Sequence, residues 1–170
     1  HFNLVRKWGP IPIIYKSLPI DSNVETVRLH RNTIDECFDY IIKLLDQATP
    51  DLPLVPASID EYGRITKAIC VSFKARVEVY AASPLFNGNS EEVGLVDNKG
   101  TQLFPTKTEE QKLQRWTDAM NACKEAIDVC EKANIKLYDG SDIAYRMSDS
   151  LKTTLTLRES FNDRWNSEVI

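Results

Sequence analysis

The sequence predicts an all-α protein made of stacked helical hairpins with long connecting loops. Two stretches, about 34–48 and 110–133, carry apolar residues every three or four positions, which places these residues along one face of a helix. A third stretch, about 66–82, contains no glycine or proline and is apolar on most sides. Proline- and glycine-containing segments separate the three stretches and interrupt helices.

The composition and net charge of the chain exclude several classes of partner. The chain has 170 residues, enough for one domain with a core, and is 42% apolar and 27% charged. Its net charge is −4, and no run of lysine or arginine exceeds two residues. Nucleic-acid and anionic-membrane surfaces depend on clustered positive charge, so we expect neither kind of partner. No apolar stretch reaches the ~18 residues of a membrane span.

The two ends of the chain suggest that it is part of a longer protein. It begins at His1 without a methionine or a signal-peptide pattern, and it stops at the apolar pair Val169–Ile170. We therefore expect residues 1–170 to form a single helical-repeat domain that is incomplete at both ends.

The first two helices are indicated by their ends. Residues 1–9 have the apolar spacing of the tail of a helix, and Gly9 followed by Pro10 predicts where it stops. The next residues, up to about 20, read as an extended connection. Thr33 and Glu36 have the spacing of a capping box, which predicts the start of the second helix. Its apolar face comprises Ile34, Cys37, Phe38, Ile41, Leu45 and Ala48, and Thr49–Pro50 and Leu52–Pro53 end it.

The helix at 66–82 carries an arginine on the face expected to be packed. Lys67, Lys74 and Glu78 cluster within roughly 20° of one another and form a thin polar stripe. Arg76 projects about 180° from that stripe. Because an unpaired buried charge is costly, we expect Arg76 to meet a carboxylate, with Asp46 as a candidate. An ion pair that fixes helix register is favoured over a contact with an anion or a sugar. The packed side would carry Ile69, Phe73, Val77 and Tyr80.

The second half of the chain contains a long loop and a third strong helix. Residues 87–108 are rich in Asn, Gly, Asp and Ser and predict a loop, which at this length is often a binding or variable element. The helix at about 110–133 ends at Asn134, and its apolar stripe comprises Trp116, Ala119, Cys123, Ala126, Ile127 and Cys130. The last segment fits one helix or two short ones, with Tyr145, Met147, Leu151, Leu155 and Leu157 as apolar positions, and Phe161 to Ile170 ends in what reads as the start of a strand.

The spacing of two helix starts suggests a repeat. Thr33 and Thr66 stand 33 residues apart, close to the ~34-residue tetratricopeptide period. The long loop at 87–108 breaks this period before the third helix.

No catalytic or metal-binding pattern is found in the sequence. Nucleophile elbows, glycine-rich phosphate loops, zinc-protease motifs and calcium loops are missing. The four cysteines form no C-x-x-C pair, so we expect free buried thiols rather than a zinc site or a disulfide; they are Cys37, Cys70, Cys123 and Cys130. We therefore predict a binding or scaffolding protein, without catalytic residues, metal or cofactor.

Exposed tryptophans with polar neighbours would indicate a sugar site, because sugar C–H faces stack on aromatic rings. Trp165–Asn166 has that composition, although packing is favoured even there. Trp8 and Trp116 are expected to pack between helices. The ligand-binding residues therefore remain unassigned.

Several segments in order carry a family resemblance. They are HFNLVRKWGPIPII, a helix begun at Arg31 and closed by Leu-Pro, GRITKAICVSFKARVEVYAASPLFN, W-x2-A-x2-A-x3-A-I from Trp116, and WNSEVI at the end. Together they resemble the SusD/RagB family of outer-membrane nutrient-binding lipoproteins of Bacteroidetes, of which the chain would be the middle, helical-repeat part.

The resemblance implies a tetratricopeptide-like fold and a non-enzymatic role. Such proteins sit on the cell surface through an N-terminal lipid, here upstream of His1, and cover a SusC-type TonB-dependent transporter. They capture oligosaccharides, or in some members peptides, and this segment would be scaffold. No position matches a family ligand motif. Two other readings remain open: a tetratricopeptide-type scaffold that binds only protein, and part of an enzyme whose active site lies elsewhere.

Overall fold

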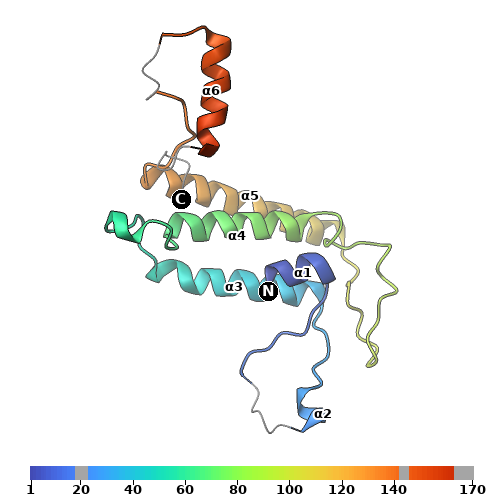
Figure 1. The fold of residues 1–170 in the computed structure, drawn as a ribbon. Coiled ribbons are helices and arrows are strands. Elements are labelled where there is room, and N and C mark those ends of the chain that lie inside the picture. The colour runs from blue at the N-terminus through green and yellow to red at the C-terminus, as the bar shows by residue number, and fades with distance from the viewer. Residues whose placement is uncertain (18–22, 142–145, 163–170) are drawn as a thin grey trace.

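Three antiparallel helices lie side by side at the centre of the structure: α3 (Ile34–Ala48), α4 (Lys67–Ala82) and α5 (Glu109–Lys132) (Figure 1). The computed structural model describes residues 1–17, 23–141 and 146–162. The end of α3 contacts the start of α4, where the Cys70 thiol lies 3.6 Å from the carbonyl oxygen of Leu45. The start of α4 in turn lies beside the end of α5, where Ser72 Oγ is 3.6 Å from Cys130 Sγ. This arrangement confirms the predicted stack of helical hairpins.

The remaining helices are shorter or peripheral. α1 (Phe2–Trp8) packs on α3, α2 (Val24–Val27) is a single turn capped by Asn23, and two 3-10 turns cover Thr49–Asp51 and Ile59–Glu61. α2 was not predicted from the sequence. α6 (Asp149–Asn162) stands away from the three central helices in Figure 1. No strand occurs in the described parts of the chain, where the only bridge joins Val96 and Gln102.

Helix ends lie where the sequence places them. Thr33 and Glu36 form a capping box, and the Thr66 hydroxyl accepts from the Ile69 N–H, so two capped helix starts stand 33 residues apart. A second capping box starts α5 at Thr108 with Gln111, which the sequence analysis missed. Gly9 (φ 67°) and Asn134 (φ 56°) follow α1 and α5 in left-handed conformations, as their positions predicted.

The main core joins α1, α3, α4 and the long loop. Phe38 of α3 meets Phe86 edge to face at 5.2 Å, and Phe2 of α1 contacts Phe73 and Tyr80 of α4 in the same geometry. Val5 and Val77 are completely buried between them. Burial of such side chains contributes roughly 1.5–3 kcal/mol each, so α1 belongs to the folded unit.

A second, smaller core joins α4 to α5 through small residues. Val71 and Ala75 of α4 face Ala122 and Ala126 of α5. Alanine at facing positions allows close approach of two helix axes. The expectation of small residues at helix contacts is therefore confirmed for this pair.

The long connection between α4 and α5 is a structured loop. Its buried residues Leu103 and Phe104 join the main core, and the Leu103 carbonyl accepts from the Ile34 N–H at the start of α3. Asp97 Oδ1 accepts from the backbone N–H groups of Lys99 and Thr101, which closes the tip. The prediction of a long loop is confirmed, and the loop is fastened to the helices at both ends.

The predicted packed face of α4 is confirmed for Val77, but the prediction for Arg76 is wrong. Arg76 is exposed and, with Arg6, hydrogen-bonds to Tyr80, which lowers the pKa of that phenol. The carboxylate of Asp46 pairs instead with Lys74. Lys74 of the polar stripe faces the neighbouring helices, where Asp46 of α3 and Glu125 of α5 present opposite charge to it.

The last segment differs in part from its prediction. One helix, α6, replaces the choice between one helix and two, and it ends at Asn162. The start of a strand expected toward Ile170 lies outside the described residues. Tyr145, Trp165 and Asn166 lie outside the described residues. α6 has no buried residue.

All four cysteines are free thiols, as expected. Cys37 and Cys70 are buried, whereas Cys123 and Cys130 are only partly buried. Burial raises the pKa of the Cys37 thiol, although its hydrogen bond to the Ile11 carbonyl opposes that effect.

Candidate functional site

Two of the hollows beside the first half of α5 differ in character. One lies between α3, α4 and α5 and is lined mainly by charged side chains. The other lies between the start of the long loop and α5, and Trp116 forms part of its wall. Each has a volume of about 460 Å³, within the size range of small-molecule sites.

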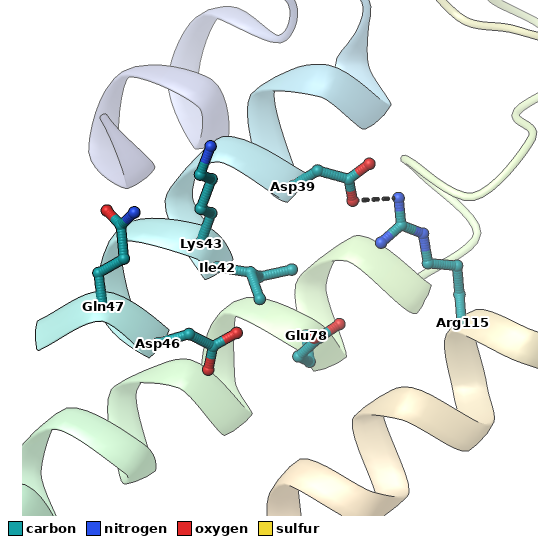
Figure 2. A pocket seen from close by; sticks show the side chains of 7 residues that line it. All are labelled: Asp39, Ile42, Lys43, Asp46, Gln47, Glu78 and Arg115. Atoms are coloured by element: carbon teal, nitrogen blue, oxygen red, sulfur yellow. Dashed lines mark hydrogen bonds and ion pairs between the residues drawn. The ribbon is translucent and has the colours of Figure 1, made fainter. Parts of the chain in front are cut away.

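Figure 2 shows the charged hollow, where Asp39 of α3 and Arg115 of α5 reach toward each other beside Glu78 of α4. Arg115 Nη2 lies 2.7 Å from Asp39 Oδ1 and 3.3 Å from Asp35 Oδ1. Burial by itself lowers the pKa of Arg115, but the hydrogen bond and the charges of the two aspartates outweigh it and raise that pKa. The other lining residues are Ile42, Lys43, Asp46 and Gln47.

Lys74 forms the second bridge across the three helices. Its ammonium lies 2.7 Å from Asp46 Oδ1 on α3 and 3.4 Å from Glu125 Oε2 on α5. Burial lowers the pKa of Lys74, and the two carboxylates more than compensate for this effect, so the net shift is upward. Lys74 therefore has the register-fixing role that the sequence analysis gave to Arg76.

Glu78 is the exception in this network. Its side chain is buried, with 6% of its surface exposed, and its Oε2 atom has no hydrogen-bond partner in the described structure. Burial raises the pKa of the Glu78 carboxyl, while the charge of Arg115 opposes the shift. By contrast, Asp39 and Asp46 of the same hollow are each paired with a cation, Arg115 and Lys74 respectively.

The described lining of the charged hollow offers carboxylates but no serine- or cysteine-type nucleophile. Its lining contains no cysteine, serine or histidine, so a nucleophile with a neighbouring base is missing. Across the residues that the structure describes, no group of three or more His, Cys, Asp or Glu side chains has the geometry of a metal site.

The hollow beside Trp116 combines an aromatic wall with a polar rim. Trp116 is 47% exposed, and Leu113 lies one turn earlier on α5. The loop side contributes Asn87, Gly88, Asn89, Ser90 and Glu91, and the remaining lining residues are Ala82, Pro84, Glu109 and Lys112. Aromatic faces beside amide, hydroxyl and carboxylate groups are the composition of a sugar site.

This hollow corrects the sequence-based view of the tryptophans. Trp8 is 72% exposed and Trp116 47% exposed, so the expectation that both pack between helices is wrong for this structure. The apolar stripe on α5 is wider than the face that α4 covers, and Trp116 lies on its uncovered side. The Asn- and Gly-rich start of the loop borders this hollow. The sequence marked the loop as a frequent kind of binding or variable element but did not locate a site in it.

Comparisons with known proteins agree with this fold. A family model described as "Starch-binding associating with outer membrane", of the SusD-like class, matches residues 1–79. The solved structure of a protein called BT4246 superposes with a TM-score of 0.78 and 28% identity, over 94% of this chain and 30% of that one. Its selenomethionine form gives a TM-score of 0.73 and 27% identity over 94% and 29%.

A SusD-like protein (BF3747) from Bacteroides fragilis NCTC 9343 is similar at 25% identity and a TM-score of 0.54, over 82% of this chain and 20% of that one. The chain thus spans less than a third of the length of these solved relatives. No curated protein matches this chain. No helix in the described residues is long and apolar enough to cross a membrane. Residues 1–79 thus match the SusD-like family model, and the helical architecture of the chain is similar to that of these solved structures.

Proposed function

We propose that the protein containing this chain binds oligosaccharides at the cell surface and works with a SusC-type TonB-dependent transporter in the outer membrane. The observation that carries this proposal is the SusD-like match, whose family description names both starch binding and association with the outer membrane. The N-terminal lipid anchor and the surface location belong to the same proposal.

The three central helices act in this proposal as scaffold. Lys74 joins α4 to both neighbours, and Arg115 joins α5 to α3, so the relative positions of the three helices are held by charge as well as by packing. Rigid support of this kind keeps loops in place for ligand binding. The long loop between α4 and α5 is the element that the scaffold presents.

A second function, binding of a partner protein alone, is favoured by one observation. α5 exposes an apolar stripe made of Leu113, Trp116, Met120 and Ile127, each 47% exposed or more. Helical-repeat proteins use such surfaces to bind peptides or helices. The SusD-like match supports glycan binding more directly, so partner binding remains the alternative.

Isothermal titration calorimetry on the whole natural protein tests the choice. Maltoheptaose, cellohexaose and mannohexaose serve as neutral glycan probes, and a mixed peptide pool serves as the contrast. Saturable heat with one of the glycans supports the proposal. Binding of peptides with no heat from any glycan would replace it with the alternative.

A further inference from the structure

We propose that the hollow beside Trp116 is a subsite for one unit of a neutral oligosaccharide. The inference rests on the proposed function and goes beyond it by assigning a place and residues to glycan binding. The subsite combines Trp116 of α5 with Asn89, Ser90 and Glu91 of the loop.

The aromatic wall is suited to the apolar face of a sugar ring. Nearly half of the Trp116 surface is uncovered, and Leu113 extends the same wall by one helical turn. A pyranose presents C–H groups on its faces, and these groups pack against the electron-rich face of an indole. Trp8 is more exposed still, but it does not line the hollow beside Trp116.

The rim supplies both hydrogen-bond donors and acceptors. Asn89 Oδ1 accepts from the Glu91 N–H at 3.0 Å, which leaves its amide NH₂ to donate to a sugar hydroxyl. The Glu91 carboxylate and the Ser90 hydroxyl are exposed at the same edge and can accept from a second hydroxyl. Hydroxyl groups of a sugar act in both ways, so a mixed rim fits them.

The rim and the wall belong to one rigid unit. The buried Asn87 side chain donates to the carbonyls of Ala82 in α4 and Lys112 in α5, at 3.2 and 3.0 Å, and accepts from Lys107. Gly88 follows with φ +70°, and a Cβ there would lie only 3.0 Å from Lys112 Cε. The loop therefore leaves α4 in contact with α5, and little ordering is required on binding.

The charges of the hollow favour an uncharged ligand over an anionic one. The lining has two carboxylates, Glu91 and Glu109, against one ammonium, Lys112, which gives −2 + 1 = −1. Lys112 is already paired with Glu109 at 2.9 Å. A sulfated or uronic-acid sugar would be repelled by the net negative charge of the lining and would find no unpaired cation there. A neutral sugar is not repelled and needs no cation.

The test measures affinity for maltoheptaose, with cellohexaose and mannohexaose as second and third probes, by calorimetry on the whole natural protein. Trp116→Ala is expected to weaken binding of the glycan by about tenfold or more, because it removes the stacking surface. Asn89→Ala, at a loop position outside the core, is expected to weaken binding several-fold without affecting the fold. Trp8→Ala is the matched control, since it removes an exposed tryptophan elsewhere, and affinity should stay unchanged.

Each outcome separates the subsite from the general function. If the unaltered protein binds a glycan and both Trp116→Ala and Asn89→Ala bind it equally well, the subsite is wrong and the proposed function stands. If Trp116→Ala removes only tryptophan fluorescence that acrylamide does not quench, and Asn89→Ala leaves affinity unchanged, Trp116 is a packing residue and the subsite is wrong. If none of the three glycans binds to the unaltered protein, the proposed function fails and the subsite with it.

Discussion

A charged side chain in the middle of α4, Lys74, is tolerated because α3 and α5 each place a carboxylate within ion-pair distance of it. Lys74 meets carboxylates on both sides, and its distances of 2.7 and 3.4 Å place it among the charge-assisted bonds that stabilise partly buried ions. Glu78, one turn later, lacks such a partner at Oε2. The same helix face thus contains a satisfied cation and an unsatisfied acid.

Arg115 and Arg76 provide a direct test of which arginine holds the helices together. Arg115→Met should lower the free energy of unfolding by about 2 kcal/mol, because it leaves Asp35 and Asp39 without their guanidinium, although solvent screens the more exposed Asp39. Arg76→Met, at an exposed position, should change it by no more than about 0.5 kcal/mol. Urea unfolding followed by circular dichroism measures both. A larger loss for Arg76→Met would restore the role that the sequence alone suggested.

Glu78 predicts a specific dependence of stability on pH. Burial raises the pKa of Glu78 in the folded protein above its value in the unfolded chain, so folding favours the protonated carboxyl. The stability associated with this group is present below the unfolded pKa and is lost as pH rises through the folded pKa. Glu78→Gln should therefore stabilise the protein at neutral pH, by on the order of 1 kcal/mol, and this gain should vanish in acid.

The measurement for Glu78 is a series of thermal melts between about pH 4 and 8. Glu92→Gln is the matched control, because it makes the same chemical change at an exposed loop position and should alter the curve little. A constant difference between Glu78→Gln and the unaltered protein across this range would show that the Glu78 carboxyl does not titrate abnormally.

At the scale of helices, the residues at which a helix begins and ends were predictable from the sequence. The rotation of a helix about its own axis was not. Thr33 with Glu36, and Gly9 before Pro10, are local signals that act through hydrogen bonds within a few residues, so the sequence is sufficient to find them. The rotation of α4 depends on Asp46 and Glu125, which are distant in sequence. A helix that is apolar on most sides has no single face to indicate its orientation.

The capping box of α5 gives a prediction at this scale. Thr108→Ala removes the hydroxyl that accepts from the Gln111 N–H and should lower the free energy of unfolding by about 1 kcal/mol. Thr117→Ala is the matched control inside the same helix, where the hydroxyl bonds back to the Leu113 carbonyl. Such a bond adds little to a helix, so this variant should be neutral or slightly stabilising. Equal losses in urea unfolding for the two variants would contradict a capping role for Thr108.

At the scale of the whole molecule, the helical architecture and the resemblance to SusD-like proteins could be predicted, but the candidate sugar site could not. The site exists because the loop after α4 is tied to α5 through Asn87, a contact between residues 25 positions apart along the chain. Helical spacing placed Trp116 correctly on the apolar stripe of α5. It could not show that α4 would cover the alanines of that stripe and leave the indole uncovered.

The uneven burial of the helices predicts uneven protection from hydrogen exchange. α4 lies between α3 and α5 and buries eight of its residues, whereas α6 buries none and exposes Leu151, Leu157 and Phe161. Local opening is cheap where few apolar contacts must break. Amides of the segment 67–82 should therefore exchange most slowly, and those of 149–162 fastest among the longer helices, when deuterium uptake of the chain is followed by mass spectrometry. Segment 2–8 provides an internal reference, because α1 is short but anchored by the buried Phe2 and Val5. If the amides of 149–162 exchange as slowly as those of 67–82, the apolar side chains of α6 are packed against another surface in solution. The uncovered apolar stripe of α5 would then be the first surface to examine as the partner of α6.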